Sequence, residues 1–243
     1  MKLAVISDIH SNLEALRAVL ADLEGAGVQE VVSLGDNLGY GPDPAAVLQL
    51  LRRRGIPSVM GNHELALLEP GYLNWFNHQA RQALILNRRR LGPEDLAWVR
   101  GLPPYLVRWE VRLVHGLPPD SITSYLFETG GSRLARIMSQ LPEPLCFVGH
   151  THQLQWVCLQ GRRVKRRSFT ATPLELRPGW RYLVNSGSVG QPRDGDTRAK
   201  YVIYDQEAAT VEARKVEYDF RRTAAKMREL GLPEVYARCL EGG

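Results

Sequence analysis

Apolar and polar positions alternate in blocks along the N-terminal part of the chain, and these blocks predict strands and helices in turn. Short apolar runs at 2–7 and 30–36 are typical of buried strands, and the run at 57–64 is expected to be a third strand that leads into a loop. Between them, 12–27 and 42–55 carry apolar residues at helical spacing and end in glycine, a common helix stop signal. Strand–helix–strand units of this length indicate a parallel sheet with helical crossovers.

The middle of the chain continues with both kinds of element. Residues 72–100 favour helices, and the strands 105–110 and 111–116 are expected to pair through a short turn. A helix at 132–141 and an apolar strand at 144–150 follow. The pattern is therefore still that of an α/β protein.

Beyond residue 150 the pattern changes to the alternation of antiparallel hairpins. A helix at 221–231 and a short tail end the chain. We therefore expect an α/β fold, a four-layer α-β-β-α sandwich in which two mixed β-sheets pack face to face and helices flank them. We expect a single domain over 1–243, with the C-terminal helix and tail from about 219. The hairpin segments are 154–169, 181–189 and 199–220.

Composition narrows the class of protein. Hydrophobic residues make up 44% and charged residues 23% of the 243 residues, which is ordinary for a globular protein. No apolar run approaches the roughly 20 residues of a membrane helix. The N-terminal stretch MKLAVISDIHSN reaches a carboxylate and an imidazole too soon for a signal peptide. We therefore expect a cytoplasmic protein with no membrane partner.

The formal net charge of +5 permits a phosphate-bearing partner. The densest basic run is GRRVKRR at 161–167, and it is either the solvated arm of a hairpin or a nucleic-acid patch. Aromatic residues do not interleave this run, which weakens a function in stacking on single strands. Cys146, Cys158 and Cys239 form no CxxC pair. We expect them to be free thiols, buried or without a chemical role, in a reducing compartment.

Side chains of the metal-ligand type directly follow the predicted strands. Ligand sites in α/β sheets lie at the carboxyl ends of strands, where Asp, Asn and His offer oxygen and nitrogen ligands. Five of the six histidines lie at such ends, and His78 falls inside a predicted helix. The candidates are Asp8 and His10, then Asp36, then Asn62 and His63, then His115, and finally His150 and His152.

The stretch GHTHQ at 149–153 is the most unusual part of this pattern. If the preceding strand continues, His150 and His152 point to the same face. A hydrophobic core does not call for two neighbouring imidazoles, so we expect both to bind metal. Glycine precedes Asp36, Asn62 and His150, as a tight backbone turn beside a crowded site requires. This many ligands suits two divalent ions that share a bridging carboxylate.

These motifs resemble those of the calcineurin-like metallophosphoesterase superfamily, whose fold is a β-sandwich flanked by helices. Within it, the chain is similar to the small bacterial branch of phosphodiesterases and diadenosine tetraphosphatase-related phosphatases. The stretch NSGSVGQPRDGD at 185–196 is similar as well, and the resemblance covers residues 1 to about 205. The motifs that carry it are Asp8-x-His10, Gly35-Asp36, Gly61-Asn62-His63-Glu64, His115 and Gly149-His150-Thr151-His152.

The resemblance implies a role for each candidate. Asp36 would bridge two divalent metals, and His63 would be the catalytic residue that faces the phosphate. The first metal would be held by Asp8, His10 and His152, and the second by Asn62, His115 and His150.

One position departs from the pattern of the superfamily. Many of its phosphoprotein phosphatases carry an Asp three residues after the bridging Asp, and this Asp orients the catalytic His. Here that position is Gly39. Either another carboxylate orients His63, for which the adjacent Glu64 is a candidate, or His63 works unassisted.

The expected charge of the site suits phosphoryl chemistry. Two divalent cations outweigh the carboxylates Asp8 and Asp36, which leaves positive charge for a phosphoryl group. We expect a metal-bridging hydroxide to attack phosphorus in line, while His63 protonates the leaving oxygen or stabilises the phosphoryl charge. The mixed nitrogen and oxygen ligands accept Mn, Fe, Zn, Co or Ni.

Three further side chains have two interpretations each. Asn12 binds the substrate phosphate, or it caps the helix that follows it. Arg193 clamps a substrate phosphate, or it is a solvated loop residue. Tyr40 stacks on a base, or it packs against its neighbours.

The sequence thus predicts a binuclear metal-dependent phosphoester hydrolase, a phosphodiesterase or phosphatase that acts on a small molecule or a nucleotide. Alternatives are a dinucleoside polyphosphate hydrolase and a nuclease, which would take nucleic acid as its partner. An alternative of another class is a non-catalytic protein-interaction scaffold with the same fold. A scaffold is expected to have lost ligands or the catalytic His, whereas all eight candidates are present. The sequence determines neither the substrate nor the oligomeric state.

Overall fold

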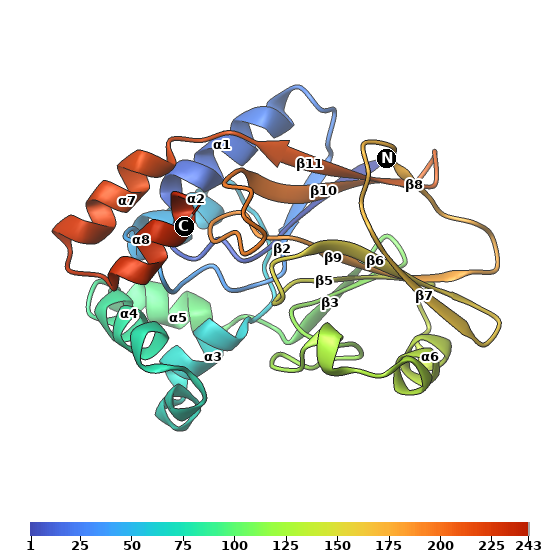
Figure 1. Cartoon of the computed structure of the whole chain (residues 1–243), viewed down its shortest axis with the longest axis horizontal. Helices are drawn as coiled ribbons and strands as arrows, with labels where there is room; N and C mark the ends of the chain where they lie inside the picture. Colours follow the sequence, from blue (N-terminus) through green and yellow to red (C-terminus); the bar gives the residue numbers. More distant parts are fainter. Residues whose placement is uncertain (243) are drawn as a thin grey trace.

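The strands form two stacked sheets (Figure 1). The computed structural model describes residues 1–242, and the order of the first, five-stranded sheet is given for these residues. Its strands are, in order, β2 (Glu30–Ser33), β1 (Lys2–Ile6), β10 (Ala199–Asp205), β11 (Thr210–Val216) and β8 (Leu174–Glu175). β1 and β2 pair in parallel, as predicted, whereas β10 pairs antiparallel with both β1 and β11.

The second sheet has six strands within the same residues. They are, in order, β3 (Tyr105–Arg108), β4 (Val111–Val114), β5 (Leu145–Val148), β9 (Arg181–Ser186), β6 (Leu154–Gln160) and β7 (Arg163–Ser168). β4, β5 and β9 run parallel, and β6 pairs antiparallel with both β9 and β7. The hairpin expected at 181–189 is therefore wrong, because β9 is inserted between β5 and β6.

Helices cover the outer face of each sheet. They are α1 (Leu13–Glu24) and α2 (Pro44–Arg53) on the first sheet and α6 (Gly131–Gln140) on the second. Side chains alternate along β1, so Leu3 packs between the sheets with Phe147, whereas Ala4 faces α1. On the other side, Leu134 of α6 packs against Cys146. The predicted α-β-β-α sandwich of two mixed sheets is confirmed.

The segment 57–64 differs from the predicted strand and loop. Ser58 forms an isolated parallel bridge with Ser33, and helix α3 (Asn62–Leu68) begins directly afterwards. The Glu64 carboxylate accepts a hydrogen bond from the backbone N of Gly61, which satisfies one of the free donors at the helix start. Asn62 and His63 therefore lie in the first turn of a helix.

The C-terminal segment forms two helices, α7 (Phe220–Glu229) and α8 (Glu234–Leu240), so the expected short tail is wrong. Both pack against α4 (His78–Arg88) through a shared apolar cluster that includes Ala83, Met227 and Leu240. Figure 1 shows the pair beside α4, at the left of the molecule. The end of the chain is thereby joined to its N-terminal half.

Three shorter helices complete the fold. α5 (Pro93–Arg100) and the 3₁₀ helices η1 (Pro70–Trp75) and η2 (Leu126–Glu128) lie in the connections. The basic run 161–167 lies on the β6–β7 hairpin, where β7 is an edge strand whose charges hinder pairing with another chain. None of the helices within residues 1–242 has the length and apolar character needed to cross a membrane.

Candidate metal centre

The predicted ligands converge at one end of the two sheets. Asp8 and Asp36 follow the parallel strands β1 and β2, and His115 and His150 follow the parallel strands β4 and β5. The ligand atoms form three overlapping groups, and within each group they lie within 4.8 Å of one another. Two of them, which we call the ligand groups, are Asp8–His10–His152 and Asp36–His115–His150, and the third, His10–Asp36–His63, shares one residue with each.

The first group consists of Asp8, His10 and His152. Nε2 of His152 lies 3.2 Å from Oδ1 of Asp8 and 3.1 Å from Nε2 of His10. Oδ2 of Asp8 accepts hydrogen bonds from Ser7 Oγ at 2.6 Å and from the backbone N of His150 at 3.0 Å. Oδ1 is buried and has no hydrogen-bond partner among the residues described. An unpaired buried carboxylate oxygen is costly, and a bound cation removes that cost.

The second group consists of Asp36, His115 and His150, with Asn62 beside it. Nε2 of His115 lies 3.3 Å from Oδ2 of Asp36 and 3.1 Å from Oδ1 of Asn62. The same Oδ2 lies 3.9 Å from Nε2 of His10, a member of the first group. Asp36 therefore lies between the two groups, at the place where a bridging carboxylate is predicted.

Each ligand histidine is hydrogen-bonded to a backbone carbonyl through one ring nitrogen. Donation of that N–H leaves the other ring nitrogen as the one that can bind a metal once it is deprotonated. The pairs are His10 Nδ1 with Leu38 O at 2.9 Å, His115 Nδ1 with Leu34 O at 2.8 Å, His150 Nε2 with Thr123 O at 3.2 Å, and His152 Nδ1 with Gln191 O. The donor set and its supports fit a divalent metal.

The backbone at the ligands lies in the left-handed region. The φ angles are 54° at Asp8, 48° at His10, 49° at Asp36, 67° at His150 and 61° at His152. Side-chain-bearing residues rarely adopt such angles, and strain of this kind gathers at functional sites.

The expectation that His150 and His152 share one strand face is wrong, because β5 ends before them. Each joins a different ligand group from the loop.

The GHTHQ loop approaches Asp8 so closely that a side chain at its first position does not fit. A Cβ on Gly149 would lie 2.0 Å from Ser7 Oγ and 2.8 Å from Asp8 Oδ2. The buried Asn185 holds this loop, since its Nδ2 donates to Gly149 O at 2.7 Å and to Thr151 Oγ1 at 2.8 Å. The sequence pattern assigns Asn185 no role. The available signal is its position in an apolar strand, β9, near the end that carries the site.

Burial and opposite charge together set the protonation of these groups. Burial raises the pKa of Asp8 and Asp36, but His152 and His115 respectively outweigh it and hold both pKa values below their usual range. Burial lowers the pKa of His150 to about 3. Burial would also lower the pKa of His115, but the nearby negative charge of Asp36 has the larger effect and raises the pKa of His115 to about 9. The carboxylates thus remain ionised and attract positive charge.

His63 is held differently from the ligand histidines. Its Nε2 lies 3.8 Å from Oδ2 of Asp36, and within residues 1–242 its buried Nδ1 has no hydrogen-bond partner. Its ring packs edge-on against Tyr40 and Phe76, at centroid distances of 4.7 and 4.8 Å. Burial lowers its pKa to about 4. His63 therefore lies beside the ligand groups without the carbonyl bond that fixes a ligand.

The glycine at position 39 is explained by the same ring. A Cβ on Gly39 would lie 2.0 Å from Nδ1 of His63, so an Asp at this position would collide with the imidazole. Glu64 does not take its place, because its carboxylate accepts hydrogen bonds from the backbone N of Asp36 and of Leu38, at 2.8 and 3.0 Å. Glu64 holds the loop that carries Asp36, and aromatic packing orients His63.

The remaining candidates lie around this centre. Asn12 caps α1, where its Oδ1 accepts from Ala15 N and its Nδ2 donates to Gly190 O, so the structure shows the capping interpretation. Tyr40 is buried and packs against the rings of His10 and His63. Arg193 extends from an exposed loop, and its Nη2 donates to Tyr40 Oη at 3.2 Å.

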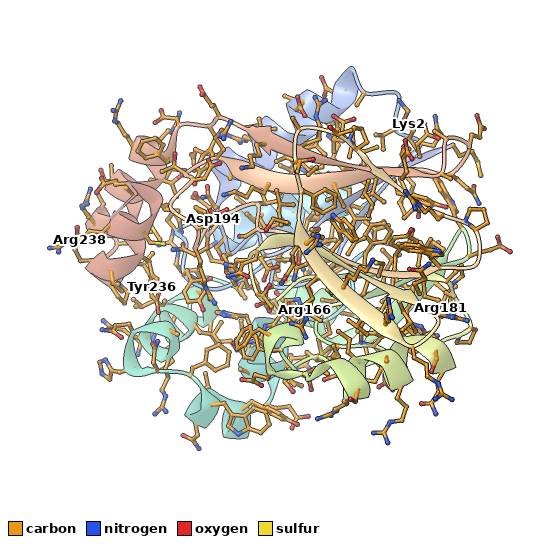
Figure 2. All side chains as sticks on the ribbon, turned by 45° about the vertical axis from the view of Figure 1, so that its right-hand side comes forward. Lys2, Arg166, Arg181, Asp194, Tyr236 and Arg238 are labelled. Carbon is orange, nitrogen blue, oxygen red and sulfur yellow. The ribbon has the colours of Figure 1, made fainter. Side chains whose placement is uncertain are left out.

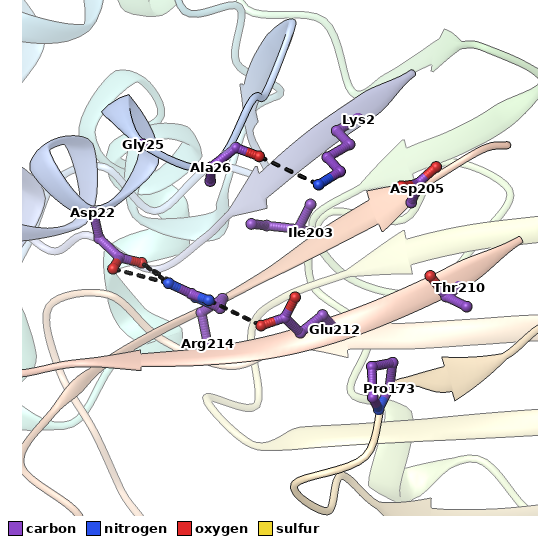
Figure 3. Close-up of a pocket in the computed structure, with 10 residues that line it drawn as sticks. All are labelled: Lys2, Asp22, Gly25, Ala26, Pro173, Ile203, Asp205, Thr210, Glu212 and Arg214. Atoms are coloured by element: carbon purple, nitrogen blue, oxygen red, sulfur yellow. Dashed lines mark hydrogen bonds and ion pairs between the residues drawn. The ribbon is translucent and has the colours of Figure 1, made fainter. Parts of the chain in front are cut away.

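A polar pocket elsewhere lacks these properties (Figure 3). It includes Lys2, at the amino end of β1, whereas Asp8 follows the carboxyl end of that strand. Arg214 contacts Asp22 and Glu212, each at 3.0 Å. These two carboxylates therefore already have a cationic partner, and the third, Asp205, accepts hydrogen bonds from the backbone N of Glu207 and Ala208.

The comparisons with known proteins agree with this geometry. Residues 1–209 match the family model described as the calcineurin-like phosphoesterase superfamily domain. The chain belongs to this superfamily. The predicted family is therefore confirmed, and members of this family are phosphoesterases that use divalent metals.

Similar proteins span almost the whole chain. A metallophosphoesterase from Sphaerobacter thermophilus is 37% identical with a TM-score of 0.86, and the match covers 100% of this chain and 98% of that one. The uncharacterized protein MJ0912 of Methanocaldococcus jannaschii is 34% identical over 96% of this chain and 94% of its own length. The protein PH1004 from Pyrococcus horikoshii is 21% identical with a TM-score of 0.80, covers 98% of this chain and 97% of its own, and supports the fold.

Proposed function

We propose that the protein hydrolyses phosphoesters with two divalent metal ions held by the two ligand groups. The observation that carries this proposal is the position of Asp36, whose Oδ2 lies near His115 of one group and His10 of the other. The first ion would be held by Asp8, His10 and His152, and the second by Asn62, His115 and His150, with Asp36 shared.

Bound ions of this kind lower the pKa of water and polarise a phosphoryl oxygen. The protein's own side chains then supply orientation and proton transfer. The ring nitrogens of His63 are not bonded to a carbonyl, and its Nε2 lies beside Asp36. His63 would therefore contact the phosphoryl group, where it would stabilise the phosphoryl charge or, once protonated, give a proton to the leaving oxygen.

Arg193 would bind the substrate phosphate from the pocket beside the ligand groups. It lines the same pocket as Asn62 and His150, and its bond to Tyr40 keeps the guanidinium near the ligand groups. A guanidinium offers two parallel N–H donors to a phosphate. The support for Asn12 as a phosphate ligand is weaker, because its amide is occupied by the helix cap and by Gly190 O.

The completeness of the ligand set favours an enzyme over a non-catalytic scaffold. All the predicted ligands converge, and four histidines keep the carbonyl bonds that metal ligands need. The mixed nitrogen and oxygen set suits Mn, Fe, Zn, Co or Ni.

Metal analysis followed by an activity screen tests the proposal. The purified protein is analysed for metal, then assayed with Mn²⁺ on a monoester, a diester, cyclic nucleotides and dinucleoside polyphosphates. We expect about two ions per chain and hydrolysis of at least one class. A metal-loaded protein that hydrolyses none of them would contradict the proposal and favour the scaffold.

A further inference from the structure

An aromatic pocket of about 520 Å³ lies beside the ligand groups. Asn62 and His150 line the pocket and also belong to the predicted metal ligands, so a molecule bound there contacts the metal centre. The volume is in the range of small-molecule sites. The aromatic residues that line it are Tyr40, Tyr72, Trp75, Phe76, Tyr125 and Tyr236.

These residues come from segments that are far apart in the sequence. The connection between α3 and α4, which includes η1, supplies Tyr72, Trp75 and Phe76, and α8 supplies Tyr236. Tyr40 comes from the loop between β2 and α2, and Tyr125 from the loop between β4 and η2. The family domain ends at residue 209, so Tyr236 comes from a part of the chain outside it. Figure 2 shows Tyr236 on the side of α8 that faces α4, with Arg238 pointing outward. The C-terminal helices therefore add a wall to the pocket of this protein.

The aromatic rings leave flat surfaces for a ligand. Tyr125 stacks on the His150 ring at 3.7 Å and 13°, and Tyr40 and Tyr236 contact each other at 4.4 Å. Trp75 contacts Tyr72 at 4.9 Å, yet 70% of its surface is exposed. A tryptophan this exposed is unusual, because Trp is highly buried on average. Because Trp75 lines the pocket and is exposed, its ring is available to stack on a flat ligand.

The charge of the pocket selects the kind of ring. Arg193 is the strongly basic lining residue, and the other polar groups are amides and hydroxyls such as those of Asn77 and Thr123. The described lining includes no Asp or Glu. The pocket therefore suits a planar, hydrogen-bonding ring joined to an anionic group, whereas a phosphorylated aliphatic side chain would leave the aromatic walls unused.

We propose that this pocket binds the nucleobase of a nucleotide whose phosphate lies against the metal ligands, and that Trp75 and Tyr236 give the protein its preference for ligands that carry a base. The inference rests on the proposed function, because it places the phosphate at that centre. Bases stack on aromatic side chains with little dependence on which base is present. The preference is therefore for nucleotides over sugar phosphates, with weak discrimination among bases.

Binding of two matched probes tests the proposal without hydrolysis. The non-hydrolysable phosphonate analogue of AMP is titrated calorimetrically into the Mn²⁺-loaded protein, and the same ribose phosphonate without the base is titrated in parallel. We expect the base to increase affinity about tenfold or more, as stacking on aromatic residues does. Equal affinity for the two probes would overturn the proposal.

Variants then locate the preference in the pocket. Trp75→Ala and Tyr236→Leu should each weaken the AMP analogue about tenfold and leave the ribose probe unchanged. Leu at 236 keeps an apolar side chain against α4, so folding is maintained. Tyr105→Ala is the matched control, because Tyr105 is an aromatic residue that is 39% exposed and does not line the described pocket. Equal losses for both probes would mean that the pocket does not bind the base.

The hydrolysis screen described above separates this inference from the proposed function. Activity without preference for the base would retain the hydrolase and overturn the nucleobase pocket. Preference for the base without hydrolysis of any ester would retain the pocket and overturn the hydrolase.

Discussion

The ligand groups and the aromatic pocket share His150, and Asn62 lies beside the second group and also lines the pocket. The two regions are nevertheless held in place in different ways. The ligand groups are buried, and each ligand histidine is fixed by a hydrogen bond to a backbone carbonyl. The pocket is lined by rings that contact one another, and Trp75 is largely exposed. Hydrogen bonds are directional, whereas ring contacts constrain orientation less. The proposed chemistry thus lies on the hydrogen-bonded part, and the proposed choice of substrate on the part held by ring contacts.

His63 lies on the boundary between the two regions. Its backbone N donates to Asp36 in the ligand groups, while its ring packs against Tyr40 and Phe76 of the pocket. Changes on the two sides of this boundary should therefore have separable effects on metal content and on turnover.

The largest effect is expected from Asp36→Ala. Loss of a carboxylate that lies between both groups should remove both ions and abolish activity. Because substitution of supporting residues alone weakens metal binding about 10–100-fold, loss of this ligand should weaken it by more than about 100-fold. Metal analysis after dialysis measures it, and full metal content in the variant would contradict the bridging role.

His63→Ala should reduce kcat by about 10²–10⁴-fold, the usual contribution of a general acid, while metal content stays unchanged. The reason is that His63 lacks the carbonyl bond shared by the ligand histidines. Steady-state kinetics and metal analysis on one preparation distinguish a catalytic role of His63 from a role as a metal ligand. If the metal is lost together with activity, His63 is a ligand and its catalytic role is wrong.

Gly39→Ala should displace the His63 ring and lower kcat by about tenfold or more, toward the level of His63→Ala. The added Cβ would lie 2.0 Å from Nδ1, at a position whose φ is +95°. Gly55→Ala is the matched control, because Gly55 also has a positive φ of +62° but has nothing within 4 Å of the added Cβ.

Both variants should lose some stability from backbone strain, about 1–3 kcal/mol. Activity should fall in the Gly39 variant but not in the Gly55 variant. Thermal unfolding monitored alongside kinetics separates the two effects, and equal activity in both would show that Gly39 does not position His63.

The smallest effect is expected from Asn185→Ala, which removes two hydrogen bonds to the GHTHQ loop without touching a ligand. We expect metal affinity to fall about 10–100-fold, as it does when supporting residues are replaced. Excess Mn²⁺ should restore full kcat, since the ligands remain. A titration of activity against Mn²⁺ tests this, and a kcat that stays low at saturation would point to damage beyond the loop.

The sequence by itself determined the layered fold and the candidate ligands. Apolar runs of period and length typical of strands locate the strand ends, and parallel strands bring their carboxyl ends to one edge. The sequence pattern therefore suffices to place Asp8, Asp36, His115 and His150 near one another. Local pattern was insufficient at 57–64, where the capping carboxylate of Glu64 starts a helix soon after a strand-like run.

Only the tertiary structure decided what surrounds these ligands. The left-handed turns at His150 and His152, the ring packing that orients His63, and the pocket wall from Tyr236 all depend on contacts between distant segments. The physical reason is that side-chain periodicity indicates which face of a helix or strand is buried, but it does not indicate which loops contact one another. Contacts between loops follow from the packing of the whole chain, and the proposed choice of substrate depends on them.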